Sequence, residues 1–546
     1  MEPIGTNDPT RRNFLRLATA GAAVAAGVAV ARPAAAAAPD RAPFVANGAL
    51  VIDVRDHGAR GDGTTDDTAA LQAALNAGKG QIVYLPPGTY PVSTMLSVFS
   101  GTTVVATATT VIRRTAGPAI MGNGVLGDFT ATKWDGESDI TIQGGVWDVN
   151  AGAVTASGSA FGFSHGHNVR FTDLTVRDVQ RHHGIELNAM KTVRVVNCRF
   201  EGFSDPEGNR GYSEAVQMDY AGGPSHFGLF GAADFYGCQD IEISGCYAGP
   251  SARFPSFPRL AGSHGGPDGH QHTGLRVLNN YAVGCTEWAI RLYDWTDAVV
   301  ESNQIVGGGG GIQIGPAGVQ PGGNIIVRGN TLRDLSGIKE ASGRPPDAAI
   351  CVGRLNDART RNLVIEGNII QDVVFEGISV YRTDRAVVAH NVIARCGGVG
   401  VRVNSSPRAV ISGNNITTPG REGIVAHVGS HGSRISDNLI ELSATYGISI
   451  TDNVDDVVVR DNTVFGAGTT AGTAAALRVS NYANRTALLG NTVRRRGSGS
   501  EASYGISITG TCSGTWYTGN DLRNAGPSAA VSDQGIGSLT TPGGLT

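Results

Sequence analysis

The chain repeats a short segment of alternating apolar and variable residues about every 24 positions. Each copy begins with a small residue, as in Gly377–Tyr381 (GISVY) and Gly400–Asn404 (GVRVN). Alternation at period two is typical of a β-strand, with the apolar side chains on one face. An asparagine recurs between the copies at intervals of 23, 23, 24 and 24 residues, at Asn368, Asn391, Asn414, Asn438 and Asn462. A unit of this length that recurs so regularly predicts a solenoid.

The strands carry no helical pattern between them, which predicts an all-β fold, a right-handed parallel β-helix. Glycine, with 78 of 546 residues, is about twice as frequent as the usual ~7%. Asn and Gly suit coil corners that need left-handed backbone, and stacked Asn side chains can hydrogen-bond along the axis. A leucine-rich repeat would show periodic Leu, and a propeller blade would need about 40 residues. With 41% hydrophobic residues and a net charge of -4, the chain is too apolar to be disordered.

The first 38 residues resemble a twin-arginine signal peptide. Arg11 and Arg12 precede an apolar run from Leu17 to Val30, which is shorter than the ~20 residues of a membrane-spanning helix. Small residues at 36–38 suit a cleavage site. We therefore expect export by the twin-arginine machinery and a secreted mature protein without a membrane segment. We further expect a linker at 39–50, one β-helix domain at 51–522 and a loose Gly/Ser/Thr-rich tail at 523–546.

Residues 51–92 are expected to cap the solenoid, with a helix over residues 67–76 that Thr65 or Asp66 caps. The segment contains the motif Asp-x-Gly-Ala-x-Gly-Asp-Gly-x-x-Asp-Asp-Thr, at Asp56, Gly58, Ala59, Gly61, Asp62, Gly63, Asp66, Asp67 and Thr68. This motif resembles the pectate-lyase superfamily, which includes rhamnogalacturonases, polygalacturonase-like hydrolases, alginate epimerases and phage tailspikes. The resemblance implies the β-helix fold and a polysaccharide ligand. We interpret the motif aspartates as structural.

Ionisable residues concentrate between positions 182 and 294. Aligning the short strands places Glu186, Gln217, a coil near 268–272 and Arg291 in one outward column. Insertions near 204–266, at 204–211 and at 221–266 with several aromatic residues, interrupt the same region. Insertions on one side of a solenoid often build a binding groove, so we predict a substrate groove there.

Glycoside hydrolysis needs two carboxyl groups, a proton donor and a base or nucleophile. Glu186 with Asp219, or Asp219 with Asp268, is the predicted pair; His270 would position a carboxyl group and Arg291 would bind a substrate carboxylate. The candidate catalytic residues are Glu186, Asp219, Asp268, His270 and Arg291. The candidate substrate-binding residues are His183, Glu214, His272, Tyr293 and Asp294.

We favour a secreted glycoside hydrolase that cleaves an acidic polysaccharide and requires no cofactor. A Ca²⁺-dependent lyase or a uronate epimerase is the first alternative, with Glu186, Glu214 and Asp219 as Ca²⁺ ligands. A non-catalytic glycan-binding β-helix is the second. Nucleic acid is not an expected partner, since 43 basic residues face 47 acidic ones. The seven cysteines have irregular spacing and are expected to be buried small hydrophobes, and the sequence leaves the oligomeric state open.

Overall fold

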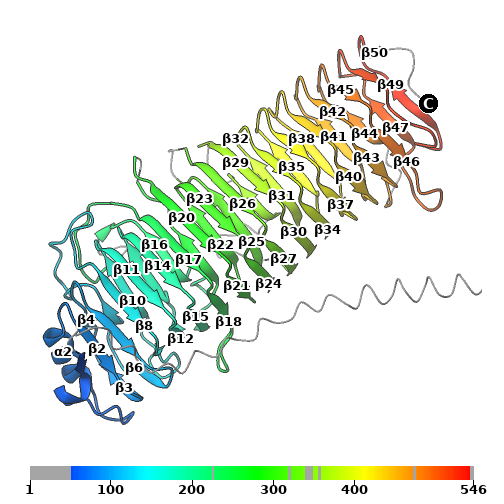
Figure 1. The fold of residues 1–546 in the computed structure, drawn as a ribbon. Coiled ribbons are helices and arrows are strands. Elements are labelled where there is room, and N and C mark those ends of the chain that lie inside the picture. The colour runs from blue at the N-terminus through cyan, green and yellow to red at the C-terminus, as the bar shows by residue number, and fades with distance from the viewer. Residues whose placement is uncertain are drawn as a thin grey trace, which may run out of the picture. The chain divides into compact units, whose positions relative to one another are not determined.

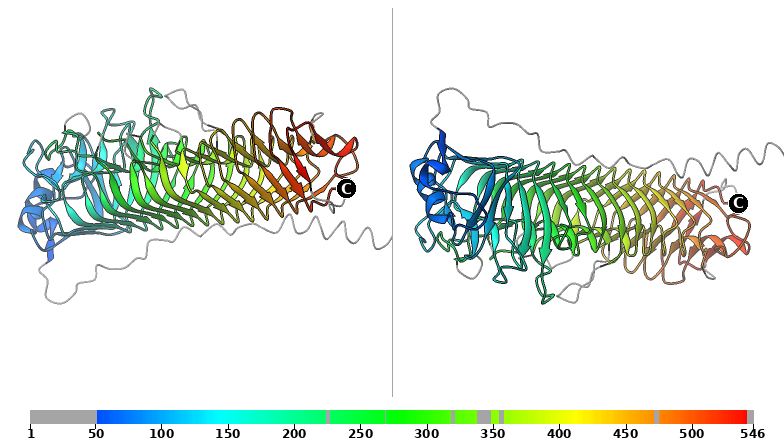
Figure 2. Two further views of the ribbon diagram at one scale, coloured as in Figure 1. Left: turned by 90° about the horizontal axis from the view of Figure 1, so that it is seen from above. Right: turned by 90° about the horizontal axis from the view of Figure 1, so that it is seen from below.

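The computed structural model describes residues 51–540 except 224–226, 268, 318–320, 338–347, 354–357 and 471–474. Its strands form three long sheets of 19, 16 and 15 strands, and a typical coil gives one strand to each. In one such coil β33 (Val387–Ala389), β34 (Val392–Cys396) and β35 (Val401–Asn404) pair in parallel with the next coil. The coils stack one upon another along the solenoid (Figures 1 and 2). The predicted parallel β-helix is confirmed.

The 16-stranded sheet carries most of the residues discussed below. Its strands are β4 (Leu96–Ser97), β7 (Ala119–Gly122), β10 (Ser159–Ser164), β13 (Ile185–Asn188), β16 (Glu214–Asp219), β19 (Arg259–Ser263), β22 (Trp288–Tyr293), β25 (Gly310–Gly315), β28 (Ala348–Val352), β31 (Glu376–Tyr381), β35, β38 (Ile424–His427), β41 (Ile448–Thr451), β44 (Ala475–Val479), β47 (Tyr504–Ile508) and β49 (Ala529–Asp533).

The apolar residues of each short strand point into the solenoid and stack on the same residues of the next coil. Ile378 pairs with Val401, which pairs with Ile424, and all three side chains are fully buried. Since each coil can bury this face only against its neighbours, the stacking of coils is the main source of stability.

A ladder of buried asparagines runs along one corner of the solenoid. Each Nδ2 donates to the Oδ1 of the next member at 2.9–3.0 Å. Its members are Asn280, Asn303, Asn330, Asn368, Asn391, Asn414, Asn438, Asn462, Asn491 and Asn520. The predicted hydrogen bonding along the axis is confirmed.

The left-handed backbone at this corner falls on the residue before each ladder asparagine, not on the asparagine itself. Gly413 precedes Asn414 with φ of 64°, and His390 precedes Asn391 with φ of 54°. Asn197 has the same left-handed backbone, with φ of 54°, and is exposed. It is therefore not a member of the ladder, and the residue that follows it is Cys198. The prediction that the recurring asparagines adopt this conformation is therefore wrong for the ladder, because an extended residue is needed there to pair with both neighbouring coils.

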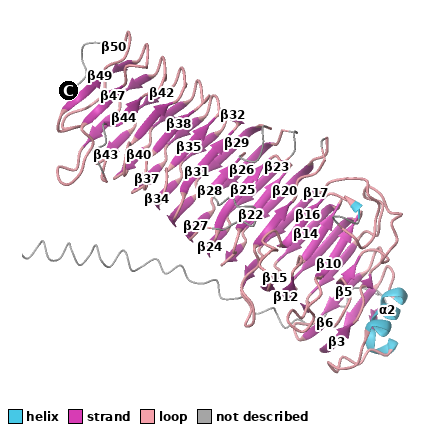
Figure 3. Ribbon diagram, turned by 180° about the vertical axis from the view of Figure 1, so that it is seen from behind, coloured by secondary structure: helices cyan, strands magenta, loops and turns pink. Residues whose placement is uncertain are grey.

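The N-terminal end is closed by α2 (Thr68–Ala77), the helix that the sequence predicts (Figure 3). The aspartates of the motif hold the loop before it. Asp67 is 1% exposed and accepts the backbone N–H groups of Arg60 (2.7 Å) and Gly61 (3.0 Å). Asp62 accepts from Thr64 and Thr65, and Asp66 accepts from Thr68 and Ser93. These contacts support the structural interpretation of the motif.

Replacing Asp67 by Ala is expected to lower the free energy of unfolding by about 2–4 kcal/mol, because two backbone N–H groups lose their buried side-chain acceptor. Chemical denaturation followed by circular dichroism measures this change. Asp56→Ala is the matched control, because Asp56 belongs to the same motif but is exposed. Equal midpoints for the two variants would contradict a structural role of Asp67.

The structure differs from the predicted domain organisation at the C-terminal end and in the region 221–266. The expected loose tail does not begin at residue 523, because β49 pairs with β47, and β50 (Leu539–Thr540) pairs with β48 (Trp516–Thr518). The region interpreted as an insertion at 221–266 contains a regular coil: β17 (Gln239–Ser244), β18 (Tyr247–Gly249) and β19. Residues 1–50, with the signal peptide and the linker, lie outside the described residues, as do residues 541–546.

The described part of the chain contains no helix long and apolar enough to cross a membrane. All seven cysteines are buried and free of disulfides, which agrees with their expected role as small hydrophobes.

Candidate functional site

An outward column of the 16-stranded sheet brings the predicted residues of several coils together. Glu186 pairs with Gly162 on one side and Gln217 on the other, and the column continues through Gly262 and Arg291 to Gln313. The strand between those of Gln217 and Arg291 is β19. The prediction that residues 268–272 form this strand is therefore wrong. Asp268, one of the predicted catalytic residues, lies outside the described residues.

Glu186 is buried without a strong ionic partner, being 2% exposed. Its Oε2 lies 3.5 Å from the Oγ of Ser159 and 3.5 Å from Nδ1 of His182. Burial, and secondarily the negative charge of Asp219, raise the pKa of Glu186 to about 8. The carboxyl group of Glu186 is therefore protonated at neutral pH and can donate a proton.

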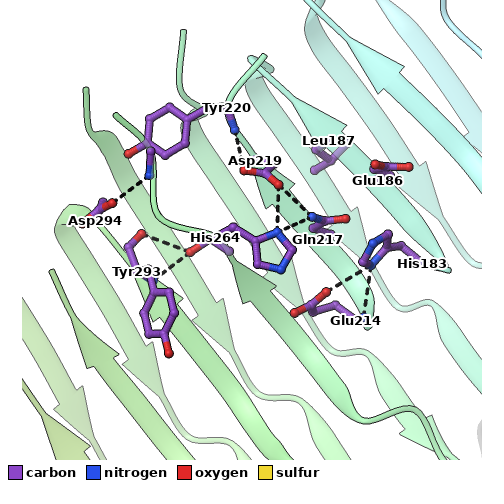
Figure 4. A network of polar contacts seen from close by, with 12 residues as sticks. His183, Glu186, Leu187, Glu214, Gln217, Asp219, Tyr220, His264, Tyr293 and Asp294 are labelled. Carbon is purple, nitrogen blue, oxygen red and sulfur yellow. Dashed lines mark hydrogen bonds and ion pairs between the residues drawn. The ribbon is translucent and has the colours of Figure 1, made fainter. Parts of the chain in front are cut away.

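Asp219 is also 2% exposed but has several hydrogen-bond donors (Figure 4). It accepts the backbone N–H of Tyr220 at 2.8 Å and the Nε2–H of Gln217 at 2.9 Å. Nδ1 of His264 lies 2.9 Å from Oδ2 of Asp219. Burial by itself would lower the pKa of His264, but the hydrogen bond to Asp219 and the charge of Glu214 outweigh it and raise that pKa. These contacts fix the orientation of the Asp219 side chain.

The sheet register fixes the offset between the two carboxyl groups. Glu186 pairs with Gln217 and Asn188 pairs with Asp219, so Asp219 lies one strand across and two residues along from Glu186. With strands ~4.8 Å apart and ~3.3 Å per residue, the two Cα atoms are about 8 Å apart. The protonated carboxyl group of Glu186 and the hydrogen-bonded carboxyl group of Asp219 thus face outward from neighbouring coils.

Glu214 is a different kind of carboxylate, because its charge is fully paired. Its Oε1 accepts from Arg259 at 2.8 Å, and its Oε2 lies 3.0 Å from Nδ1 of His183. Burial opposes ionisation, but the contact with His183 and the charge of Arg259 hold the pKa of Glu214 well below its usual range. Because Arg259 and His183 contact both of its oxygens, we interpret Glu214 as a supporting residue of the sheet and not as a catalytic one.

Arg291 and Tyr293 extend the site by one coil. The guanidinium of Arg291 lies 4.8 Å from the ring centroid of Tyr293, whose hydroxyl donates to Oε1 of Gln313 at 3.2 Å. The charge of Arg291 also acts on His264, so these groups are close neighbours. Both side chains are half-buried, as substrate-contacting residues of a groove would be.

Three other predicted residues, Asp294, His272 and His270, do not lie in the outward column of Glu186. Asp294 is 3% exposed and accepts the backbone N–H groups of Gly266 and Ala317, so it connects two loops. His272 is fully buried in β20 (His272–Leu278) of the 19-stranded sheet, where it stacks on Trp295 and burial lowers its pKa to about 4. His270 lines a separate cavity over that sheet. The prediction that His270 and His272 lie in the groove with Glu186 is wrong, because the chain has passed from one sheet to the next.

The aromatic residues predicted to line the groove from the insertion at 221–266 do not all lie near Glu186 and Asp219. Phe227 and Phe230, each 3% exposed, pack with Met95 and Ala119 on the outer face of earlier coils. The loop after β15 (Arg199–Ser204) instead brings Tyr212, 38% exposed, to within 6.1 Å of the His264 ring centroid.

Sequence reasoning missed His264 and Tyr212 and did not select Ser159 or His182 for the site. His264 immediately follows β19, in the segment that the sequence analysis assigned to an insertion. Aligning Ala261 with Val216, as the structure pairs them, would have placed His264 beside Asp219.

Only one group of potential metal ligands was found among the described residues. Ligand atoms of His182, His183 and Glu186 lie within 4.8 Å of one another. Two imidazoles and one carboxylate suit Zn²⁺ better than Ca²⁺, which prefers oxygen ligands. The predicted Ca²⁺ set of Glu186, Glu214 and Asp219 does not form such a group, because Arg259 and His183 occupy the Glu214 carboxylate.

Two family models match the chain. Residues 51–138 match "Rhamnogalacturonase A/epimerase, pectate lyase-like", and residues 354–522 match "Right handed beta helix region". Plasmin and fibronectin-binding protein A of Streptococcus pneumoniae is 27% identical over 46% of this chain and 39% of its own length. The chain thus spans about two fifths of that relative. Mannuronan C5-epimerase AlgE3 of Azotobacter vinelandii is 56% identical over 45 residues, 8% of this chain and 2% of the epimerase.

Among solved structures, the tailspike protein of E. coli bacteriophage HK620, determined in complex with a pentasaccharide, aligns with a TM-score of 0.51. The alignment has 14% identity and covers 90% of this chain and 80% of the tailspike, which shows a shared fold. The two family matches and this structural likeness agree with the three stacked parallel sheets. The chain is a right-handed parallel β-helix protein with a pectate-lyase-like N-terminal region.

Proposed function

We propose that the chain is a glycoside hydrolase that cleaves an acidic polysaccharide in the groove around Glu186 and Asp219. The observation that carries the proposal is the pairing of a protonated carboxyl group, with a pKa of about 8, and a hydrogen-bonded carboxylate on neighbouring coils. Hydrolysis of a glycosidic bond requires one carboxyl group that donates a proton and a second that acts as a base or a nucleophile.

In the proposed mechanism Glu186 donates its proton to the glycosidic oxygen as the bond to the leaving sugar breaks. Asp219 acts on the other side, as a base that takes a proton from water or as the nucleophile. His264 and Gln217 hold the Asp219 carboxyl group in place. Each of the two carboxyl groups then has one role.

The cations beside the carboxyl pair support an acidic substrate. Arg291 and His264 lie on the coils that follow Asp219, and Tyr293 offers a ring face next to Arg291. Arginine binds carboxylates in a bidentate manner, so a uronate residue of the substrate fits this end of the groove.

A uronate lyase or epimerase is the second candidate, favoured by the same Arg291, Tyr293 and His264. Arg291 would neutralise the uronate carboxylate, and the tyrosine or histidine would move the proton at the neighbouring carbon. Names of curated relatives agree with this chemistry, since they include mannuronan C5-epimerases and an alginate lyase, each matched over 8% of the chain. A non-catalytic binding role is the third candidate, since one relative is named for binding plasmin and fibronectin.

A panel of acidic and neutral polysaccharides separates these candidates. We expect new reducing ends from an acidic polymer without the ultraviolet absorbance of an unsaturated uronate. Cleavage with that absorbance would identify a lyase, and inverted C5 configuration without cleavage would identify an epimerase. Binding with no product from any polymer would contradict catalysis.

Export through the twin-arginine pathway and action outside the cell are part of this proposal. They rest on Arg11, Arg12 and the apolar run that follows, within residues that the structure does not describe. The panel is therefore run on the secreted and the cell-bound fractions of an expressing culture. Activity confined to the cell-bound fraction would contradict secretion.

A further inference from the structure

A second site of polar and aromatic residues lies over the 19-stranded sheet, where four successive coils begin their strands. The strands are β11 (His167–Thr172), β14 (Lys191–Val196), β17 and β20. The first residues of β11, β14 and β17 and the second residue of β20 form a row, in which His167 pairs with Lys191, Lys191 with Gln239 and Gln239 with Thr273. Four strands ~4.8 Å apart span about 14 Å along the solenoid axis.

Two cavities lie along this row and share Trp134 as a wall. One has a volume of about 270 Å³ and is lined by His167, Asn168, Lys191 and Thr192. The other, of about 410 Å³, is lined by Tyr236, Gln239, His270, Gln271 and Thr273, among others. We call the two cavities together the Trp134 groove. The volume of the larger one is typical of a small-molecule site.

The aromatic residues of the groove present ring faces and are flanked by lysines. Trp134 and Tyr236 meet edge to face, with centroids 5.4 Å apart and planes at 89°. The Nζ of Lys191 lies 4.8 Å from the Trp134 ring centroid, and that of Lys133 lies 5.8 Å from Tyr236. The Nε1–H of Trp134 is shielded from solvent and has no hydrogen-bond partner among the described residues. A buried donor without an acceptor is costly, and a ligand oxygen would satisfy it.

We propose that the Trp134 groove binds a segment of an acidic polysaccharide on a different sheet from the proposed cleavage site. Ring faces of Trp134 and Tyr236 suit the apolar face of a sugar, and the amide and hydroxyl groups around them suit its hydroxyl groups. Lys191 and Lys133 provide the charge for a sugar carboxylate, and no described lining residue is a carboxylate. The proposal rests on the proposed function only for the chemical class of the ligand.

The groove and the catalytic residues belong to two different sheets. It lies over the 19-stranded sheet, whereas Glu186 and Asp219 face outward from the 16-stranded sheet. A polysaccharide chain held there would keep the protein on its substrate between cleavage events, which raises the effective concentration of cleavable bonds.

The test is calorimetric titration of the full-length Glu186→Gln variant with a uronic-acid oligosaccharide. The same oligosaccharide with its carboxyl groups reduced to alcohols is the neutral probe. We expect two binding sites for the acidic probe and at least tenfold weaker binding of the neutral probe at the second site. Adding Trp134→Ala or Lys191→Met should weaken that site at least tenfold and leave the first unchanged. Lys79→Met is the matched control, because Lys79 forms the same kind of contact with Phe99 in the N-terminal cap.

The outcomes separate this inference from the proposed function. A single binding site in an enzyme that cleaves the polymer would overturn the groove alone. A second site that Lys191→Met does not weaken, or that binds both probes equally, would overturn its acidic specificity. Absence of cleavage together with binding that depends on Trp134 and Lys191 would contradict the hydrolase and leave the groove supported. Lys191→Met provides a result even if Trp134→Ala fails to fold.

Discussion

Replacing Glu186 by Gln is expected to lower kcat/KM on the cleaved polysaccharide by about 10²–10⁴-fold, because the variant keeps the shape of the side chain but has no proton to donate. The pH profile provides a second readout. In the wild-type protein kcat/KM should fall above pH 8, where Glu186 loses its proton, and this limb should disappear in the residual activity of the variant. Initial rates measured between pH 5 and pH 10 test both expectations.

Asp219→Asn should cause a loss of similar size, since an amide is neither a base nor a nucleophile. Glu376→Gln is the matched control: Glu376 is a carboxylate of the same sheet, in β31, where Arg402 and Ser379 bind it. Its activity should stay within about twofold of the wild-type value, because the substitution lies several coils away. Full activity in Glu186→Gln and Asp219→Asn would rule out this pair as the catalytic residues.

The Glu186→Gln variant should also be more stable than the wild-type protein at neutral pH. The carboxyl group has a pKa of about 8 in the folded state against a usual value of 4.5, so the folded state binds its proton more tightly. The contribution of the Glu186 carboxyl group to the free energy of unfolding is therefore fully present below pH 4.5. It falls as the pH rises and is lost once the pH passes 8. At pH 7 the gain of the variant is about 3 kcal/mol. A gain in stability with a loss of activity is typical of a functional residue and would not result from a structural one.

Replacing Asn414 by Ala is expected to lower the free energy of unfolding by about 3–5 kcal/mol. The side chain lies within the asparagine ladder and is 1% exposed. Its Oδ1 accepts from both the backbone N–H and the Nδ2 of Asn391, and its Nδ2 donates to Val388 and to Asn438. Alanine leaves these groups buried without partners in two neighbouring coils. Denaturation and hydrogen exchange of the flanking coils measure the effect.

The neighbouring residue provides the control for the ladder. Asn415 is exposed, and its side chain has one long contact, from Thr417 at 3.4 Å. Asn415→Ala should change stability by less than about 0.5 kcal/mol. If Asn414→Ala were equally mild, the ladder would be a consequence of the coil geometry and not a source of stability.

The regular part of the fold could be predicted because each coil repeats the same local requirements. Ile378 and Val380 alternate with outward residues, and Asn391 and Asn414 recur 23 residues apart, so one coil indicates the next. The cap helix was predicted from its own motif for the same reason. Such signals lie within a few residues of one another and need no knowledge of distant parts of the chain.

The prediction failed where a coil departs from that pattern. In β19 the inward positions are Ala261 and Ser263, and the buried Ser263 hydroxyl interacts with the backbone of Tyr293 and the indole of Trp295. A buried serine looks like an exposed one in sequence, so the coil was assigned to an insertion. The histidine-rich segment that follows was placed on the wrong sheet, and His264 was missed.

The sequence by itself determined the solenoid, its cap and the column that contains Glu186, because strand period and coil length are local properties. Only the tertiary structure decided the surroundings of each carboxyl group. Glu186, Glu214 and Asp219 look alike in sequence, yet burial leaves Glu186 protonated, Arg259 and His183 keep Glu214 ionised, and His264 holds Asp219. Arg259 and His264 lie 45 residues from the carboxylates they contact. The protonation state of a carboxyl group depends on such neighbours and on the loops that exclude water from it, and both are brought together only when the coils stack.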